Sequence, residues 1–140
     1  MAIKTVAIAG GSGSLGGPII ESLLSSAFEV TALVRAGKQA AFPAPVKTVT
    51  VDYASHESLV SAFQGIDAVI SVLSGPGLEY QPAIVDAAIE AGVSRFLPSE
   101  FGSNTYVPEM SEIPIFQGKV AFQKSLEKKV AQHPSLSYSL

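Results

Sequence analysis

The sequence predicts an α/β fold, namely a doubly wound parallel sheet with helices on both faces. Apolar, β-branched strand patterns alternate along the 140 residues with patterns of helical period, as in folds built from β-α-β units. The strand patterns lack polar alternation, which is typical of parallel strands covered on both faces. A glycine-rich turn joins the first strand pattern to the first helical one. Together these observations predict one domain with right-handed crossovers between its strands.

In the first half of the chain we expect strands at residues 3–9, 28–34 and 46–51, and helices at 14–26 and 56–64. Pro18 falls in the first helical turn, where its missing amide hydrogen costs little. Ser55 precedes the second helix as a capping residue, and Gly65 ends it. Residues 36–45 form a polar loop to which we assign no element.

The second half continues the alternation, with strands at residues 68–73 and 93–97 and a sixth that begins at residue 136. Helices are expected at 80–91, closed by Gly92, and at 118–132, closed by His133 and Pro134. Residues 99–117 are rich in proline, glycine, serine and asparagine and show no clear period. A loop of this length in a compact domain is usually functional.

The composition excludes several classes of protein. A hydrophobic content of 47% with 15% charged residues indicates a globular core, and a net charge of −3 without a basic run argues against nucleic-acid binding. The chain has no cysteine, which excludes disulfides and thiolate catalysis, and its two histidines argue against a metal site. No apolar stretch approaches the roughly 18 residues that span a bilayer. We therefore expect a cytoplasmic protein without a membrane contact.

The turn at residues 10–16 carries three glycines at a fixed spacing of three: Gly10, Gly13 and Gly16. In a dinucleotide-binding turn, these would form the tight bend, admit the pyrophosphate and let the helix pack closely. The hydroxyls of Ser12 and Ser14 can add hydrogen bonds to phosphate. The alternative is a glycine-rich turn that binds nothing. The surrounding strand and helix favour a Rossmann-like nucleotide site.

Arg35 ends the second strand pattern, 19 residues after Gly16. A chain that binds NAD places an acidic residue near this position, whereas a guanidinium pairs with the 2′-phosphate of NADP(H). Lys38 could add a second positive charge. The alternative is a solvated surface arginine. Asp52 ends the third strand, where it could accept from the adenine amino group or could form an Asx turn.

The ends of the fourth and fifth strands, at residues 71–75 and 99–102, should border the nicotinamide. Ser99 and Glu100 are candidates for catalysis, although a structural role for Glu100 is equally open. None of Tyr53, Tyr80 and Tyr106 is followed by lysine four positions later, so the Tyr-x-x-x-Lys pair of many reductases is not formed by them. Lys119, early in a helix, is the remaining candidate acid or base. The alternative is a solvated helix lysine.

Three segments, residues 10–16, 33–35 and 86–102, resemble the isoflavone reductase-like (NmrA-like) family of atypical short-chain dehydrogenases. The resemblance implies an NADPH-dependent reductase of aromatic or phenylpropanoid-type substrates, or a regulator that senses the dinucleotide. It implies a catalytic lysine in the pattern F-x-x-K, followed by leucine and glutamate, which residues 116–119 and 126–127 match at Lys119. It also implies cofactor contacts from the loop and from two strand ends, namely Gly10, Gly11, Ser12, Gly13, Ser14, Leu15, Gly16, Arg35, Ser71, Leu73, Ser99 and Phe101.

Members of that family have about twice this length, and their C-terminal part builds the substrate pocket. We therefore expect residues 1–140 to form an NADP-binding domain without the substrate domain, either as a fragment or as a protein that lacks most of a substrate site. A partner or a second copy would then cover the open edge of the sheet. Two functions stay open: hydride transfer with Lys119 as acid or base, and redox sensing through a protein partner.

Overall fold

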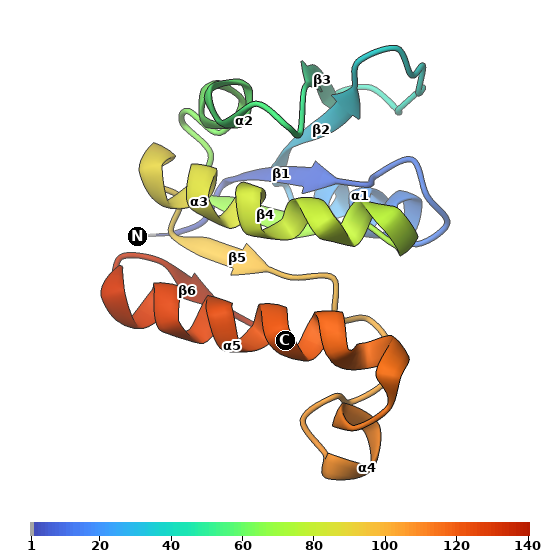
Figure 1. The fold of residues 1–140 in the computed structure, drawn as a ribbon. Coiled ribbons are helices and arrows are strands. Elements are labelled where there is room, and N and C mark those ends of the chain that lie inside the picture. The colour runs from blue at the N-terminus through green and yellow to red at the C-terminus, as the bar shows by residue number, and fades with distance from the viewer. Residues whose placement is uncertain (1) are drawn as a thin grey trace.

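The computed structural model describes residues 2–140, which form a six-stranded, all-parallel sheet in the order β3-β2-β1-β4-β5-β6 (Figure 1). The first strand lies inside the sheet, with β2 on one side and β4 on the other, so the strand order reverses beside β1. This is the predicted Rossmann-like doubly wound sheet. The strands are β1 Thr5–Ala9, β2 Glu29–Arg35, β3 Lys47–Val51, β4 Ala68–Ser71, β5 Arg95–Leu97 and β6 Ser137–Tyr138.

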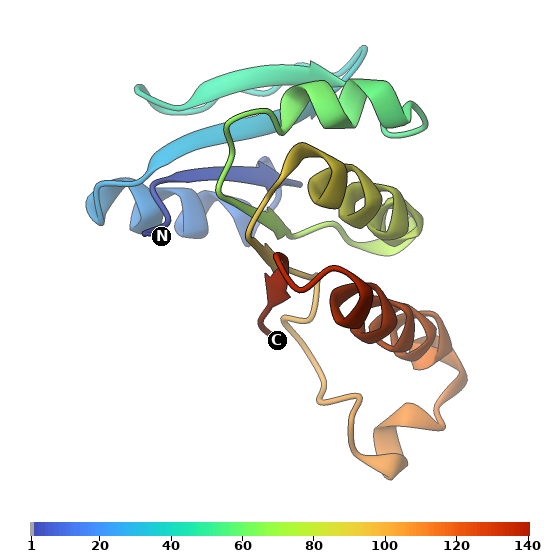
Figure 2. The same ribbon diagram turned by 90° about the vertical axis from the view of Figure 1, so that its left-hand side faces the viewer.

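Helices cover both faces of the sheet, as the sequence predicts. Figure 2 shows α1 on one face and α2, α3 and α5 on the other. Two short 3-10 helices, η1 and η2, precede α3 and α5. The helical segments are α1 Gly16–Ser25, α2 His56–Ala62, η1 Gly75–Tyr80, α3 Gln81–Ala91, α4 Pro108–Ser111, η2 Pro114–Phe116 and α5 Gln117–Gln132.

The core is divided by the sheet into two apolar clusters. In β1, Ala7 and Ala9 belong to the cluster beneath α2, α3 and α5, whereas Val6 and Ile8 belong to the cluster beneath α1. All four side chains are buried. Alternate residues of a strand point to opposite faces, so a strand with apolar layers on both sides needs apolar residues throughout. This explains why the strand patterns lack polar alternation.

The local signals for two helix ends are confirmed. The Ser55 side chain accepts a hydrogen bond from the backbone amide of Ser58, which satisfies one free donor at the start of α2. Gly92 ends α3 with a φ of 83°, a left-handed conformation that glycine adopts without steric cost.

The expected bounds differ by one or two residues from those of most elements, and three differences affect the description of the fold. The fourth strand ends at Ser71, two residues early, and residues 75–80 form the 3-10 helix η1. The segment at 99–117 contains α4 and η2, which have four and three residues and are too short to show a helical period. The sixth strand covers Ser137–Tyr138 only.

None of the helices in residues 2–140 has the length and apolar character of a membrane-spanning helix.

The Asp67 carboxylate fastens the start of β1 to the start of β4. Its Oδ2 accepts from the backbone amides of Lys4, at 2.8 Å, and Thr5, at 3.0 Å. The Thr5 hydroxyl in turn donates to the carbonyl of Gly65 and accepts from the amide of Asp67. The hydrogen bonds from Thr5 and Lys4 lower the pKa of Asp67 because they stabilise its charged form.

We therefore expect Asp67→Asn to lower the melting temperature at neutral pH and to make the melting temperature change less as the pH is lowered. A carboxyl group whose pKa is lowered by folding stabilises the protein above its unfolded pKa, and this contribution is lost as the pH falls through the folded value. Melting curves between about pH 6 and about pH 3 test this. Glu21→Gln, which neutralises an exposed carboxylate on α1, is the control. Parallel pH profiles for wild type and Asp67→Asn would contradict the prediction.

Candidate functional site

The glycines of the turn after β1 differ in what their surroundings require. Gly10 has a φ of +85°, and a Cβ atom there would lie 2.9 Å from the backbone carbonyl of Val72. A Cβ atom on Gly16 would lie 2.5 Å from the backbone of Gly11. Packing inside the protein therefore requires glycine at these two positions.

Gly13 lies at the middle of the turn, where its amide donates to the carbonyl of Gly10 at 3.1 Å. A Cβ atom on Gly13 would meet only the Gly10 carbonyl oxygen, at 3.4 Å, which is ordinary contact. The protein itself therefore leaves room for a side chain at Gly13. A ligand that approaches the backbone closely gives a reason for glycine here.

A groove of about 450 Å³ lies at the carboxyl ends of β1, β2 and β4. Six residues predicted from the sequence line it: Gly10, Ser12, Gly13, Arg35, Lys38 and Leu73. Ligands in open α/β sheets bind beyond the carboxyl ends of the strands, where the strand order reverses. The groove occupies this position.

Arg35 and Lys38 make one part of the groove positively charged. Arg35 is the last residue of β2 and is exposed, and the amide of Lys38 donates to its carbonyl in a tight turn through Gly37. Two exposed cations beside a groove can bind an anionic group such as a phosphate. The structure thus brings these two predicted residues together with the glycine turn.

A tyrosine pair that sequence reasoning missed forms part of the same groove. The rings of Tyr53 and Tyr80 are stacked, with centroids 5.1 Å apart and planes inclined by 19°. Burial raises the pKa of Tyr53 to about 12, and the Arg35 charge acts in the opposite direction. Tyr53 is therefore neutral at physiological pH and offers the groove an aromatic wall. Its position directly after Asp52, at a strand end, is the signal that could have identified it.

The other eight residues predicted to contact the cofactor do not line this groove. Asp52 is exposed, and its Oδ1 accepts from the amide of Ala54 at 2.9 Å, which is the Asx turn that the sequence left open. Its contact with adenine stays a prediction. Four more are the buried Gly11, the packed Gly16 and the exposed Ser14 and Leu15. Phe101, also outside it, is 51% exposed.

The predicted residues Ser71 and Ser99 are joined to each other in the interior. Their hydroxyls lie 2.7 Å apart, and the amide of Ser99 donates to the side-chain oxygen of Gln81 at 2.8 Å. All three residues are buried. The hydroxyls therefore connect the ends of β4, β5 and α3, and contact between these serines and a cofactor stays a prediction.

Lys119 is the third residue of α5, and its side chain is 21% exposed. Its Nζ lies 3.9 Å from Oε2 of Glu100, whose side chain is only 6% exposed. Burial raises the pKa of Glu100, while the charge of Lys119 and the side chain of Gln123 act to lower it. The two candidates that the sequence placed in separate segments are thus neighbours.

Lys119 lines a second, largely apolar cavity of about 790 Å³. Leu73 and Ser74 line both this cavity and the groove beside the glycine turn, so the two hollows adjoin at the end of β4. Its apolar walls come mainly from η1, η2 and α5, namely Leu73, Leu78, Ile115, Phe116 and Phe122. Sequence reasoning missed this wall; Ile115, an isoleucine in a polar loop and 80% exposed, was the available signal.

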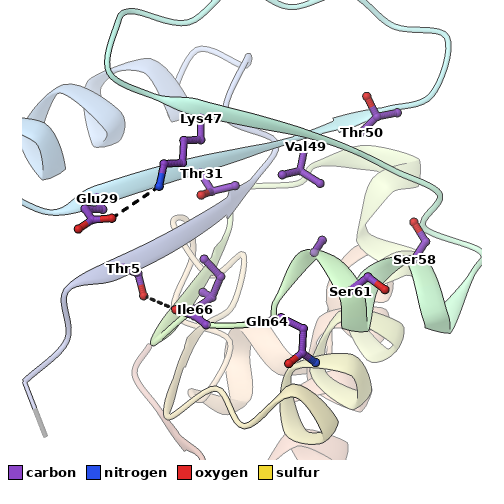
Figure 3. A pocket seen from close by; sticks show the side chains of 12 residues that line it. Thr5, Glu29, Thr31, Lys47, Val49, Thr50, Ser58, Ser61, Gln64 and Ile66 are labelled. Atoms are coloured by element: carbon purple, nitrogen blue, oxygen red, sulfur yellow. Dashed lines mark hydrogen bonds and ion pairs between the residues drawn. The ribbon is translucent and has the colours of Figure 1, made fainter.

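A third hollow, of about 590 Å³, lies at the opposite ends of the strands (Figure 3). Threonine and serine hydroxyls line it, and Lys47 and Glu29 form an exposed ion pair of 3.7 Å at one side of it. None of the predicted site residues lines it. Glu29 thus lies at the other end of β2 from Arg35.

The family assignment follows from comparison with known proteins. The model of the NmrA-like family matches residues 2–138 of this sequence. The chain belongs to the NmrA-like family. Oxidoreductase aprR of Aspergillus flavus is 40% identical to this NmrA-like chain over 107 residues, which cover 75% of this chain and 36% of that protein.

Plant reductase-like proteins are similar over a larger share of this NmrA-like chain. Isoflavone reductase homolog P3 of Arabidopsis thaliana is 34% identical over 139 residues, covering 87% of this chain and 44% of its own length. A solved structure of AtPrR2 with NADP+ and (+)pinoresinol matches with a TM-score of 0.76 and 28% identity, over 99% of this chain and 49% of that one. The NmrA-like chain therefore spans less than half the length of the curated relatives it matches.

The glycine turn yields a prediction about stability. Gly16→Ala should destabilise the protein by about 1–3 kcal/mol, since the new methyl group must displace backbone atoms of Gly11. Gly17→Ala, one residue later in α1, is the matched control because a Cβ atom there meets nothing within 4 Å. It should be neutral or stabilising by up to about 1 kcal/mol. Urea unfolding measures both; equal stabilities of the two variants would refute the packing argument.

Proposed function

We propose that this chain forms the NADP(H)-binding part of an isoflavone reductase-like oxidoreductase that reduces a small aromatic molecule. One observation carries the proposal. The groove beside the glycine turn, with its cationic part at Arg35, adjoins an apolar cavity that Lys119 lines. In this proposal the groove holds the cofactor, the cavity holds the substrate, and Lys119 supplies a titratable group in the cavity wall.

The residues of the groove fit a dinucleotide. The open position above Gly13 is the space that the cofactor's pyrophosphate would use, with the backbone amides of the turn and the Ser12 hydroxyl as donors. Arg35 and Lys38 would hold the 2′-phosphate that distinguishes NADP(H) from NAD(H). The apolar and aromatic walls of the groove would contact the bases. The structure of AtPrR2 with NADP+ and (+)pinoresinol supports this assignment.

The apolar cavity suits a substrate with aromatic rings. Its walls are mainly leucine, isoleucine and phenylalanine side chains, and the polar residues that line it besides Lys119 are Ser74, Glu79, Gln81 and Ser125. Such cavities bind flat apolar molecules through burial of surface and use their few polar groups to orient them. The similarity to isoflavone reductase homolog P3 supports a substrate of this class.

When bound, the cofactor supplies a hydride from C4 of its nicotinamide. Lys119 would hold a proton at Nζ and deliver it to the substrate atom that gains negative charge, or take one up in the reverse direction. The leucine and phenylalanine side chains around Lys119 would exclude water from this step, which strengthens the electrostatic contribution of the ammonium group.

The cofactor assignment predicts a preference for NADPH over NADH that depends on Arg35. Arg35→Ala should weaken NADPH binding about 10- to 100-fold, because a charged hydrogen-bonding partner contributes about 1.5–3 kcal/mol. NADH binding should change little. Fluorescence titration of both cofactors measures this. Lys47→Ala, which removes an exposed cation at the other end of the sheet, is the control. Equal affinity of wild type for both cofactors would remove the 2′-phosphate argument.

The catalytic assignment predicts that Lys119→Ala in the full-length protein retains NADPH binding but loses turnover. A loss of about 10²- to 10⁴-fold in kcat is the usual contribution of a general acid or base. Lys124→Ala, an exposed lysine on the same helix, should have wild-type activity. Aromatic carbonyl and benzylic ether compounds are suitable substrates for the assay. Unchanged turnover by Lys119→Ala would exclude this role.

The same titrations separate a reductase from an NmrA-like redox sensor. A sensor would bind the dinucleotide, distinguish its oxidised from its reduced form, and turn over none of these substrates. A protein whose melting temperature does not rise with NADPH would be neither, because a ligand that binds the folded state stabilises it.

A further inference from the structure

Glu100 carries a buried carboxylate that is only partly partnered. Its side chain is 6% exposed, and Oε1 has no hydrogen-bond partner within residues 2–140. The other oxygen, Oε2, lies 3.9 Å from Nζ of Lys119. Carboxylates are seldom buried unless they are paired, because removing their charge from water is costly. The position of Glu100 therefore calls for an explanation.

The backbone around Glu100 is fixed by groups other than its own side chain. The amide of Glu100 donates to the carbonyl of Pro98 at 2.8 Å, and the preceding Ser99 is bonded to Ser71 and Gln81. The carboxylate is thus not needed to hold the turn after β5. It extends from a rigid support toward the start of α5.

The lysine that it meets stands at an unfavourable place for a positive charge. Lys119 is in the first turn of α5, where the free amides and the helix dipole repel cations. The walls of the cavity beside it are largely apolar and offer the ammonium group few hydrogen-bonding partners. A fixed negative charge at 3.9 Å compensates for both effects.

We propose that Glu100 is the positioning residue for Lys119: its carboxylate holds the ammonium group at the wall of the apolar cavity and keeps the proton on Nζ until it is transferred. The inference rests on the proposed function, in which Lys119 delivers that proton. Glu100 lines neither cavity and acts through Lys119.

The other groups around Glu100 are consistent with this pairing. Gln123 faces it from α5, and Tyr106 lies near it in the segment before α4. The Tyr106 hydroxyl donates to Glu127, an exposed carboxylate of α5, at 3.5 Å. Partial burial, the neighbouring Tyr138 and the carboxylates of Glu127 and Glu100 raise the pKa of Tyr106 to about 12, so it carries no charge at neutral pH. Among these groups, Lys119 supplies the positive charge.

Trace labelling with acetic anhydride tests the inference without cofactor or substrate. The reagent acetylates neutral amines, and peptide mapping gives the ratio of Lys119 to Lys124 acetylation as a function of pH. In Glu100→Gln, this ratio at about pH 8 should rise about tenfold, the effect expected when an opposite charge within about 4–6 Å is removed. Glu100→Asp, which keeps the charge, should give a ratio closer to that of wild type. Glu127→Gln, which removes an exposed carboxylate of the same helix as Lys119, should give the wild-type ratio.

The pH profile separates charge from access. Loss of the carboxylate charge shifts the midpoint of the labelling curve to lower pH, whereas looser packing raises only its plateau. An unshifted midpoint in a folded Glu100→Gln protein overturns the proposal. Should that variant fail to fold, the titration of the Glu100 carboxyl group is followed by ¹³C NMR in Lys119→Met and in wild type. A titration midpoint at higher pH in Lys119→Met supports the pairing, and an identical midpoint refutes it.

Neither measurement depends on turnover, so the two proposals can fail separately. A shifted labelling curve together with normal activity of Lys119→Ala would remove the catalytic assignment of Lys119, and with it the purpose of the pairing. An unshifted curve together with an inactive Lys119→Ala would leave the proposed function standing and remove Glu100 alone.

Discussion

The close approach of the glycine turn to β4 is the constraint on which the site depends. The amide of Val72 donates to the carbonyl of Ala9 at 2.8 Å, and no Cβ atom fits between Gly10 and the Val72 carbonyl. The turn is thereby fixed on the neighbouring strand. The segment after β1 leads to α1 and the segment after β4 leads to α3, and these helices pack on opposite faces of the sheet. The two segments therefore diverge beyond this contact. The groove is the space between them.

Much of the fold was predictable because its signals are local. Strands buried on both faces are apolar throughout, and helix ends such as Ser55 and Gly92 carry their own caps. The glycine turn could also be predicted, since the spacing of its glycines reflects the close backbone contacts at Gly10 and Gly16. The short elements α4, η1 and η2 were not, because three to six residues are too few to establish a period.

The candidate site was predictable only in part, because much of it is assembled from residues distant in the sequence. The Tyr53–Tyr80 stack joins positions 27 residues apart, and nothing near either tyrosine indicates the other. The cavity wall at Ile115 comes from an element that the sequence did not reveal. Lys119 was identified by resemblance to a family pattern, whereas residue chemistry alone favoured a solvated helix lysine. That the Glu100 carboxylate lies beside Lys119 could be recognised only from the fold.

Ser99 and Glu100 are consecutive residues with buried polar side chains at this edge of the sheet, and they differ in how far their polar atoms are hydrogen-bonded. Ser99 is buried and has partners for both its hydroxyl and its amide, so it strengthens the end of β5. Glu100 is buried with one oxygen unpaired, which costs about 1–3 kcal/mol. That is a considerable part of the roughly 5–15 kcal/mol that stabilises a domain. A glutamine or leucine would avoid the buried charge, so the carboxylate at this position is better explained by what it does to Lys119 than by what it does for folding.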